Sequence, residues 1–230
     1  MISALILDKD GTLFDFTATW SGWARAALRD LSGGDTALAD RLAAAIRFDP
    51  DSGQFDPAST VIAGTTAEVA AELAPFLTGW EVPALADRLN ALSADAVQVP
   101  AVDLPQVLGA LRGRGLRLGL ATNDSEAAAR AHLAAAKVMD LFDFVAGYDS
   151  GHGAKPGPGQ LSAFAAAQGL SPGRVAMVGD SLHDAAAARA AGMAAVGVLT
   201  GVAPRAVLAP AFDVVLPDIG GLPGWLDSRA

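Results

Sequence analysis

Apolar residues follow two different periods along this chain. The run at residues 4–7 is continuously apolar and stops abruptly at polar residues, as in a short buried strand. From about residue 17 to residue 97, apolar residues instead recur at helical spacing, which predicts amphipathic helices. These helices are expected at 19–31, at 35–48, from the capping box at 65–68 onward, and at 83–96. We expect at most one strand in this stretch, at 60–63, and a loop at 49–57.

The pattern changes again at residue 102, after which strands and helices alternate. Strands are predicted at 116–121, 144–146, 174–178 and 194–198, with an edge strand at 212–216, and helices at 104–114, 125–136, 160–168 and 183–191. Such alternation is typical of a mostly parallel sheet that is covered by helices on both faces. The predicted fold class is therefore α/β: a Rossmann-like parallel sheet core, residues 1–15 and 98–230, with an inserted all-helical domain, residues 16–97.

The composition limits the functions that this fold can serve. The chain has 230 residues, of which 52% are hydrophobic and 18% are charged, as expected for a globular protein. Its formal net charge of -9 argues against a nucleic-acid partner, and an anionic substrate would need local positive charge or a metal ion. The absence of cysteine excludes disulfides, thiolate catalysis and cysteine-based metal sites.

The sequence has no evident targeting or membrane segment. The first apolar run is interrupted by Asp8 and is too short for the core of a signal peptide. No apolar stretch approaches the roughly 18 residues of a membrane-spanning helix. We therefore expect a cytoplasmic protein with no membrane partner, either a monomer or a homodimer.

Polar side chains collect where the predicted strands end. They are Asp8 and Asp10 after the first strand, Thr122 and Asn123 after the second, Lys155 after the third, and Asp180 and Asp184 after the fourth. Because the carboxyl ends of parallel strands share one edge of the sheet, we expect these groups to converge. Carboxylates that lie close together repel one another, and a bound cation is the simplest reason for a protein to hold them there.

This set of groups suits phosphoryl transfer. Asp8 can attack phosphorus as a carboxylate nucleophile, and Asp10 can protonate the leaving oxygen and then activate water. Asp8 and Asp180 are expected to hold Mg²⁺, which prefers oxygen ligands. The phosphoryl oxygens are expected to be bound by Thr122, Asn123 and Lys155.

The order of these motifs resembles that of the haloacid dehalogenase superfamily, and within it the group of the phosphoglycolate phosphatases. The first family motif, Asp-x-Asp-Gly-Thr, matches residues 8–12, and the other three match Thr122, Lys155, and Gly179-Asp180 with Asp184. The resemblance covers nearly the whole chain and makes residues 16–97 a cap domain. It implies Asp8 as nucleophile, Asp10 as general acid and base, and Asp8, Asp180 and the Asp10 backbone carbonyl as magnesium ligands. It also implies Asp184 as a further ligand, direct or through water, or as the residue that orients Lys155.

One residue of the first motif departs from the family pattern. The family more often has an apolar or aromatic residue where Lys9 stands. We expect Lys9 to be tolerated, with an effect on metal affinity or on local pKa values. Residues 16–97 contain no lysine, which excludes the Schiff-base mechanism of the phosphonatases of this family.

Several side chains of the expected cap and core have two interpretations. Arg47 is a candidate contact for a substrate carboxylate, although an exposed or salt-bridged arginine is the simpler interpretation. Trp20 and Trp23 are candidates to line a pocket, although core packing also explains them. His132 is predicted, like His152, to lie at the surface, and His183 to begin a helix.

The leading hypothesis is a Mg²⁺-dependent phosphatase that hydrolyses a small phosphorylated metabolite, with phosphoglycolate as the first candidate, through an aspartyl-phosphate. A phosphosugar mutase on the same core, and a catalytically silent relative that binds a phosphorylated ligand, remain open. A signalling receiver domain is disfavoured because receivers are about half this length and have no helical insert near the N-terminus.

Overall fold

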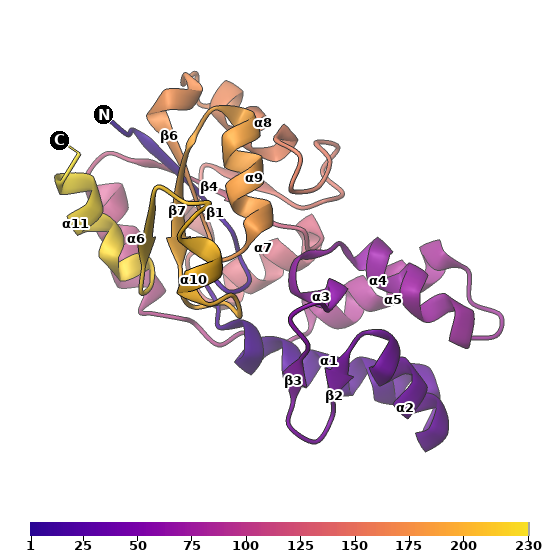
Figure 1. The fold of residues 1–230 in the computed structure, drawn as a ribbon. Helices are drawn as coiled ribbons and strands as arrows, with labels where there is room; N and C mark the ends of the chain where they lie inside the picture. Colours follow the sequence, from indigo (N-terminus) through magenta and orange to yellow (C-terminus); the bar gives the residue numbers. More distant parts are fainter. Residues whose placement is uncertain (230) are drawn as a thin grey trace.

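The computed structural model, which describes residues 1–229, is built around a six-stranded sheet (Figure 1). Every neighbouring pair of strands is parallel, in the order β5-β4-β1-β6-β7-β8. The strands are β1 (Ala4–Leu7), β4 (Arg117–Ala121), β5 (Phe144–Ala146), β6 (Val175–Gly179), β7 (Ala194–Val198) and β8 (Val214–Leu216). The parallel sheet predicted from the alternating pattern is confirmed, with β1 at its centre.

Alternate residues of each strand face opposite layers of helices. Leu5 and Leu7 of β1 belong to an apolar cluster with residues of α6 (Leu104–Gly113), α7 (Glu126–Ala135) and α11 (Leu222–Asp227). Ala4 and Ile6 belong to another, with residues of α8 (Gly159–Ala167), α9 (Leu182–Ala191) and α10 (Arg205–Leu208). Burial on both faces explains why β1 reads as a continuous apolar run.

Residues 16–97 form helices that pack mainly on one another. Their elements are α1 (Phe16–Ser32), α2 (Thr36–Ala45), β2 (Phe48–Asp49), β3 (Gln54–Phe55), α3 (Thr60–Ala63), α4 (Thr66–Leu73) and α5 (Val82–Ala94). The capping box predicted at the start of α4 is present, with Thr65 and Glu68 bonded reciprocally. The buried residues of this segment make an apolar cluster that is separate from the two clusters of the sheet.

Two local predictions for this segment were wrong. Residues 60–63 form helix α3 and not a strand, because the Ser59 side chain accepts from the Val61 N–H and starts a helical turn. The predicted loop at 49–57 contains the antiparallel pair β2–β3, which places Phe48 opposite Phe55. Both departures are short, so the helical character of the segment is unchanged.

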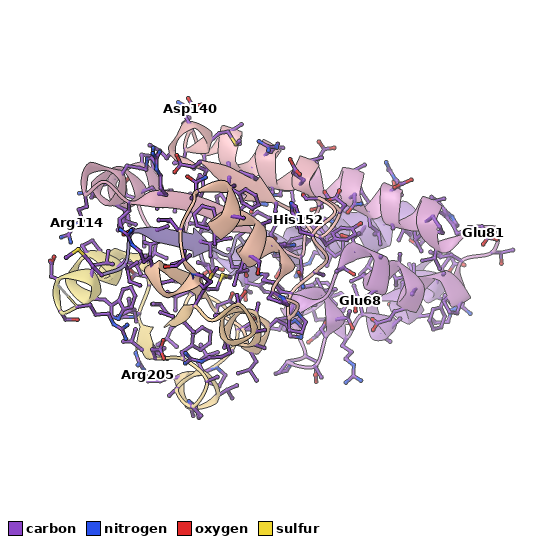
Figure 2. The ribbon with its side chains drawn as sticks, turned by 90° about the horizontal axis from the view of Figure 1, so that it is seen from above. Glu68, Glu81, Arg114, Asp140, His152 and Arg205 are labelled. Carbon is purple, nitrogen blue, oxygen red and sulfur yellow. The ribbon has the colours of Figure 1, made fainter. Side chains whose placement is uncertain are left out.

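The helical segment lies beyond the carboxyl ends of the strands, and β1 runs toward it (Figure 1). Glu81 of this segment and Arg114 lie at opposite ends of the molecule in Figure 2. The chain enters and leaves the helical segment through two stretches that lie side by side. They are hydrogen-bonded to each other: the N–H of Asp15 donates to the Val99 carbonyl at 2.8 Å, and the N–H of Ala101 donates to the Leu13 carbonyl at 2.9 Å.

The division at residues 15/16 and 97/98 stays a prediction, and residue 230, the last of the predicted core, lies outside the described residues. Within residues 1–229, none of the helices combines the length and the apolar character needed to cross a bilayer.

Candidate active site

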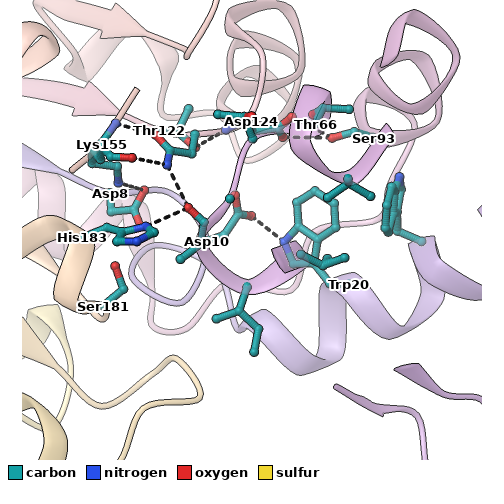
Figure 3. Close-up of a pocket in the computed structure, with 18 residues that line it drawn as sticks. Asp8, Asp10, Trp20, Thr66, Ser93, Thr122, Asp124, Lys155, Ser181 and His183 are labelled. Carbon is teal, nitrogen blue, oxygen red and sulfur yellow. Dashed lines mark hydrogen bonds and ion pairs between the residues drawn. The ribbon is translucent and has the colours of Figure 1, made fainter. Parts of the chain in front are cut away.

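The register of the sheet brings the predicted strand ends to one edge. Leu7 of β1 pairs with Leu120 of β4 and with Val178 of β6, so the three strands end nearly level. The residues that follow them therefore meet: Asp8 after β1, Thr122 after β4 and Asp180 after β6, as the close-up in Figure 3 shows for the first two. All three are buried.

Lys155 lies between two carboxylates at this edge. Its Nζ is 2.7 Å from Oδ1 of Asp8 and 2.7 Å from Oδ1 of Asp184. Asn123 holds the Lys155 backbone from both sides: its Oδ1 accepts from the Lys155 N–H at 2.9 Å, and its Nδ2 donates to the Lys155 carbonyl at 2.8 Å. The same Nδ2 also donates to the carbonyl of Ala63, the last residue of α3. The Asn123 amide thus joins the lysine to the helical segment.

Three buried carboxylates form a group that one small cation can span. Oxygens of Asp8, Asp180 and Asp184 lie within 4.8 Å of one another. The donor set consists of hard oxygen ligands, which fits Mg²⁺. Asp184 also takes part in the capping box at the start of α9, where its carboxylate accepts from the backbone N–H of Ser181 at 3.0 Å. Sequence reasoning placed Asp184 beside the metal or beside Lys155, and the geometry allows both.

Burial and mutual repulsion oppose the ionisation of these carboxyl groups. Burial raises the pKa of Asp8 to about 7; the Lys155 ammonium opposes this shift, while the Asp184 charge adds to it. Burial, with the charges of Asp8 and Asp184, also raises the pKa of Asp180 well above its ordinary value. Burial alone would lower the pKa of Lys155, but the Asp184 and Asp8 carboxylates outweigh it and raise that pKa. The site therefore has excess negative charge that a cation would relieve.

The loop after β1 supports this group through close backbone contacts. Gly11 has a φ of 75°, and a Cβ there would come within 2.3 Å of Oδ2 of Asp180. Thr200, in the loop after β7, donates its hydroxyl to the Gly11 carbonyl at 2.6 Å. Gly201 comes even closer to the carboxylate, since a Cβ on it would lie 1.7 Å from Oδ2 of Asp180. Sequence reasoning missed these two residues, although they too follow a predicted strand.

Asp10 is not one of the three grouped carboxylates, and its side chain has partners of its own. Its Oδ1 accepts from the Lys9 ammonium at 2.9 Å and from Nε1 of Trp20 at 2.8 Å, the latter drawn in Figure 3. Lys9 is fully buried and also lies 3.0 Å from Oδ2 of Asp124 and from Nδ1 of His132. His132 is therefore buried, and its predicted surface position was wrong: it lies on the inner face of α7, whose apolar pattern does not distinguish it from a surface residue.

A pocket that is partly open to solvent lies between the sheet edge and the helical segment. Asp8, Asp10 and Lys155 line it from the sheet side, and Trp20 and Trp23 from α1. Both tryptophans also belong to the apolar cluster of the helical segment, so both interpretations of them hold. The pocket-lining residues also include Thr122, Asn123, Ser181 and His183.

The structure also shows where Arg47 and His183 lie. Arg47 is absent from the pocket lining and lies 3.9 Å from Asp56 at the surface, so the simpler interpretation of it holds. His183 is the second residue of α9, as predicted, and its Nδ1 is 3.1 Å from the Ala63 carbonyl.

Comparison with known proteins shows the family of this chain. The model of one protein family, the haloacid dehalogenase-like hydrolases, matches residues 2–192, which is most of the chain. The chain belongs to this family. The family resemblance inferred from the four motifs is therefore confirmed.

The hydrolase is similar to proteins named as phosphoglycolate phosphatases. It is 38% identical over 120 residues to the phosphoglycolate phosphatase of Rhodospirillum rubrum, covering 52% of this chain and 50% of that protein. The chain thus spans about half the length of the curated relatives it matches.

Solved structures share the fold of this hydrolase. A structure described as a predicted phosphoglycolate phosphatase from Haemophilus somnus superposes with a TM-score of 0.77 at 20% identity and 98% coverage of both chains. The β-phosphoglucomutase of Clostridium difficile superposes with a TM-score of 0.68 at 19% identity, covering 100% of this chain and 97% of that one. At these identities, the two superpositions show that the architecture is shared and leave the reaction open.

Proposed function

We propose that this hydrolase is a Mg²⁺-dependent phosphatase of a small phosphorylated metabolite, working in the cytoplasm through an aspartyl-phosphate on Asp8. The supporting observation is the position of Asp8: one buried carboxylate contacts the Lys155 ammonium and shares a cation-sized space with Asp180 and Asp184. The names of the relatives, which match about half of their length, point in the same direction.

In the first step, Asp8 would attack phosphorus. Its Oδ1 already accepts from Lys155 Nζ and from the backbone N–H of Lys9, each at 2.7 Å, which leaves Oδ2 to form the new bond. The Thr122 hydroxyl accepts from the Asp124 N–H, so its own hydrogen is available for a phosphoryl oxygen. When bound, Mg²⁺ would neutralise the carboxylates and the phosphoryl oxygens that they must approach.

Asp10 would supply and then remove the proton. Because Lys9 and Trp20 both bind its Oδ1, its Oδ2 is the oxygen left to protonate the departing alkoxide. The resulting carboxylate would then accept a proton from the water that attacks the aspartyl-phosphate. That second attack breaks the bond between Asp8 and phosphorus and releases inorganic phosphate.

The helical segment, residues 16–97, would act as a cap over this chemistry. Its carbonyl at Ala63 accepts from Asn123 and from His183, which hold the segment against the sheet edge. A cap closed in this way excludes water from the phosphoryl group before the alcohol has left.

The test uses 4-nitrophenyl phosphate with added Mg²⁺, with EDTA, and with Asp8→Asn. We expect hydrolysis that needs Mg²⁺ and falls by at least about 10³-fold in Asp8→Asn, because the nucleophile is lost. Asp140→Asn, at an exposed position, is the matched control and should keep full activity. Undiminished activity in Asp8→Asn would reject the nucleophile. Release of a hexose 6-phosphate rather than free phosphate from a hexose 1-phosphate would instead indicate a mutase.

A further inference from the structure

Trp20 donates its indole N–H to Asp10, the residue that acts as acid and base in the proposed mechanism. The distance from Nε1 of Trp20 to Oδ1 of Asp10 is 2.8 Å, and the bond is drawn in Figure 3. Trp20 belongs to α1 of the helical segment, whereas Asp10 lies in the loop that follows β1. A side chain with an apolar role in the cluster of that segment thus also makes one specific polar contact at the sheet edge.

The same carboxylate oxygen accepts a second bond, from the Lys9 ammonium at 2.9 Å. A carboxylate that is held by one donor can still rotate about that contact, and either of its oxygens can accept. Two donors on one oxygen occupy both of its lone pairs and restrict this rotation. Within residues 1–229, the side-chain hydrogen bonds of Asp10 all end on Oδ1, so Oδ2 stays available for proton transfer.

The two donors come from different parts of the molecule. Lys9 follows β1, and its Nζ is held by two further contacts, with Oδ2 of Asp124 and with Nδ1 of His132, each at 3.0 Å. Its three hydrogens therefore have three partners. Because the other donor, Trp20, comes from α1, the Asp10 carboxylate is oriented jointly by the sheet edge and by the helical segment.

The indole ring of Trp20 is itself held by packing. It stacks on the ring of Phe16 at a centroid distance of 6.3 Å and meets the ring of Trp23 edge to face at 5.0 Å. The Lys9 ammonium lies 5.5 Å from its centre. A donor whose own position is fixed by packing can orient a catalytic group, because the group must adapt to the donor.

Trp23 shows that an indole of this cluster can be buried without an acceptor. It belongs to the same apolar cluster as Trp20, but its Nε1 has no hydrogen-bond partner within the described residues. Burial in the cluster therefore does not by itself account for the bond between Trp20 and Asp10. The bond is a separate feature, and its effect falls on the carboxylate.

We propose that Trp20 is a positioning residue for the acid–base step: with Lys9, it holds Oδ1 of Asp10 so that Oδ2 meets the leaving oxygen. In that step the bond from Asp8 to phosphorus forms and the bond from phosphorus to the leaving oxygen breaks. The proton on Oδ2 of Asp10 passes to that oxygen. This inference rests on the proposed phosphatase function and adds a residue of the helical segment to its proton transfer.

The test compares 4-nitrophenyl phosphate with phenyl phosphate, each with Mg²⁺. Nitrophenolate departs with little help, whereas phenolate gains more from protonation as it leaves. We expect Trp20→Phe to lower kcat/KM for phenyl phosphate by about ten- to a hundredfold, since the general acid is misplaced. For 4-nitrophenyl phosphate the loss should stay below about threefold, because little proton transfer is needed. A role in packing alone would lower both values alike.

Trp23→Phe is the matched control. It removes the same atoms from the same apolar cluster but takes no hydrogen bond from Asp10. We expect it to keep the native ratio of kcat/KM between the two esters. Asp10→Asn, which removes the acid itself, should change this ratio in the same direction as Trp20→Phe and by more.

The outcomes separate this inference from the function on which it rests. Equal losses on both esters in Trp20→Phe, or the same selective loss in Trp23→Phe, overturn the positioning role and leave the phosphatase in place. An unchanged ratio in Asp10→Asn, or native turnover of 4-nitrophenyl phosphate alone, rejects Asp10 as the acid and the inference with it. No turnover of either ester overturns the phosphatase and the inference together.

Discussion

Lys9 is a fully buried ammonium in a site that already contains many charges. It is compensated by Asp10 and Asp124 and lies 5.5 Å from the centre of the Trp20 ring. Burial alone would lower the pKa of Lys9, but the two carboxylates raise it, so the side chain stays charged. Burial and the Lys9 charge lower the pKa of His132, whose neutral ring accepts at Nδ1 from Lys9 and donates at Nε2 to the Ser93 carbonyl. A single residue thus joins the first motif to two helices.

Replacing Lys9 by Met should reveal this role. The unbranched apolar part of the side chain is largely kept, but Asp10 and Asp124 are left buried without their cation. We expect the free energy of unfolding, measured by urea titration, to fall by about 3–5 kcal/mol. Adding Asp124→Asn to this variant should recover part of the loss, because one unpaired charge is removed. A Lys9→Met protein as stable as the unaltered one would show that the ion pairs contribute nothing net.

At the scale of elements, the loop after β7 supports Asp180, one of the three buried carboxylates. Thr200 ties this loop to the Gly11 carbonyl, and Gly201 lets its backbone approach Asp180. The contact between Gly201 and Asp180 joins the loops that follow two neighbouring strands, since β7 pairs with β6. The position of Asp180 therefore depends on two loops in addition to its own strand.

Gly201→Ala tests this support. An added methyl group must displace the Asp180 carboxylate or the loop, because the space is absent. We expect kcat/KM to fall by about 10²-fold and the Mg²⁺ concentration for half-maximal activity to rise, since catalytic groups tolerate little misplacement. Gly173→Ala is the matched control, because a Cβ there meets nothing within 4 Å. Full activity in Gly201→Ala would mean that the loop gives way at no functional cost.

For the whole molecule, the buried carboxylates link stability to pH and to metal. The folded pKa of Asp8, about 7, lies above its ordinary value of 3.8, so between these values the folded state binds more protons than the unfolded state. Stability from this group is then fully present below pH 3.8 and is lost as pH rises through about 7. Asp180 shifts in the same direction and adds to the effect.

Mg²⁺ should reverse this loss, because a cation binds the deprotonated carboxylates and only in the folded state. We expect the thermal midpoint to rise on adding Mg²⁺, and to rise more at pH 8 than at pH 5.5. In Asp8→Asn, the difference between the two pH values should shrink. The measurement is a melting curve with EDTA or with Mg²⁺ at each pH. A larger shift at the lower pH would contradict the assignment of this carboxylate group as a cation site.

Much of this protein follows from local pattern. The alternation after residue 102 predicts the parallel sheet. Because parallel strands end at one edge, the sequence also predicts that Asp8, Thr122 and Asp180 lie close together. The capping box at Thr65 is equally local, because its four residues contain both partners. Where a second local signal competed, the prediction failed, as at residues 60–63, where an N-cap outweighs β-branched residues.

The tertiary structure alone decided which polar groups are buried together and which lack a partner. The sequence predicted a surface position for His132 and no partner for Lys9, since nothing near them in the chain indicates that they face each other across 123 positions. The unpaired N–H of Trp23 and the missing Cβ of Gly201 are likewise visible only once distant segments meet. The physical reason is that apolar periodicity specifies which face of an element is buried. The cost or gain of burying a charge or a donor depends on the groups that the rest of the fold places against it.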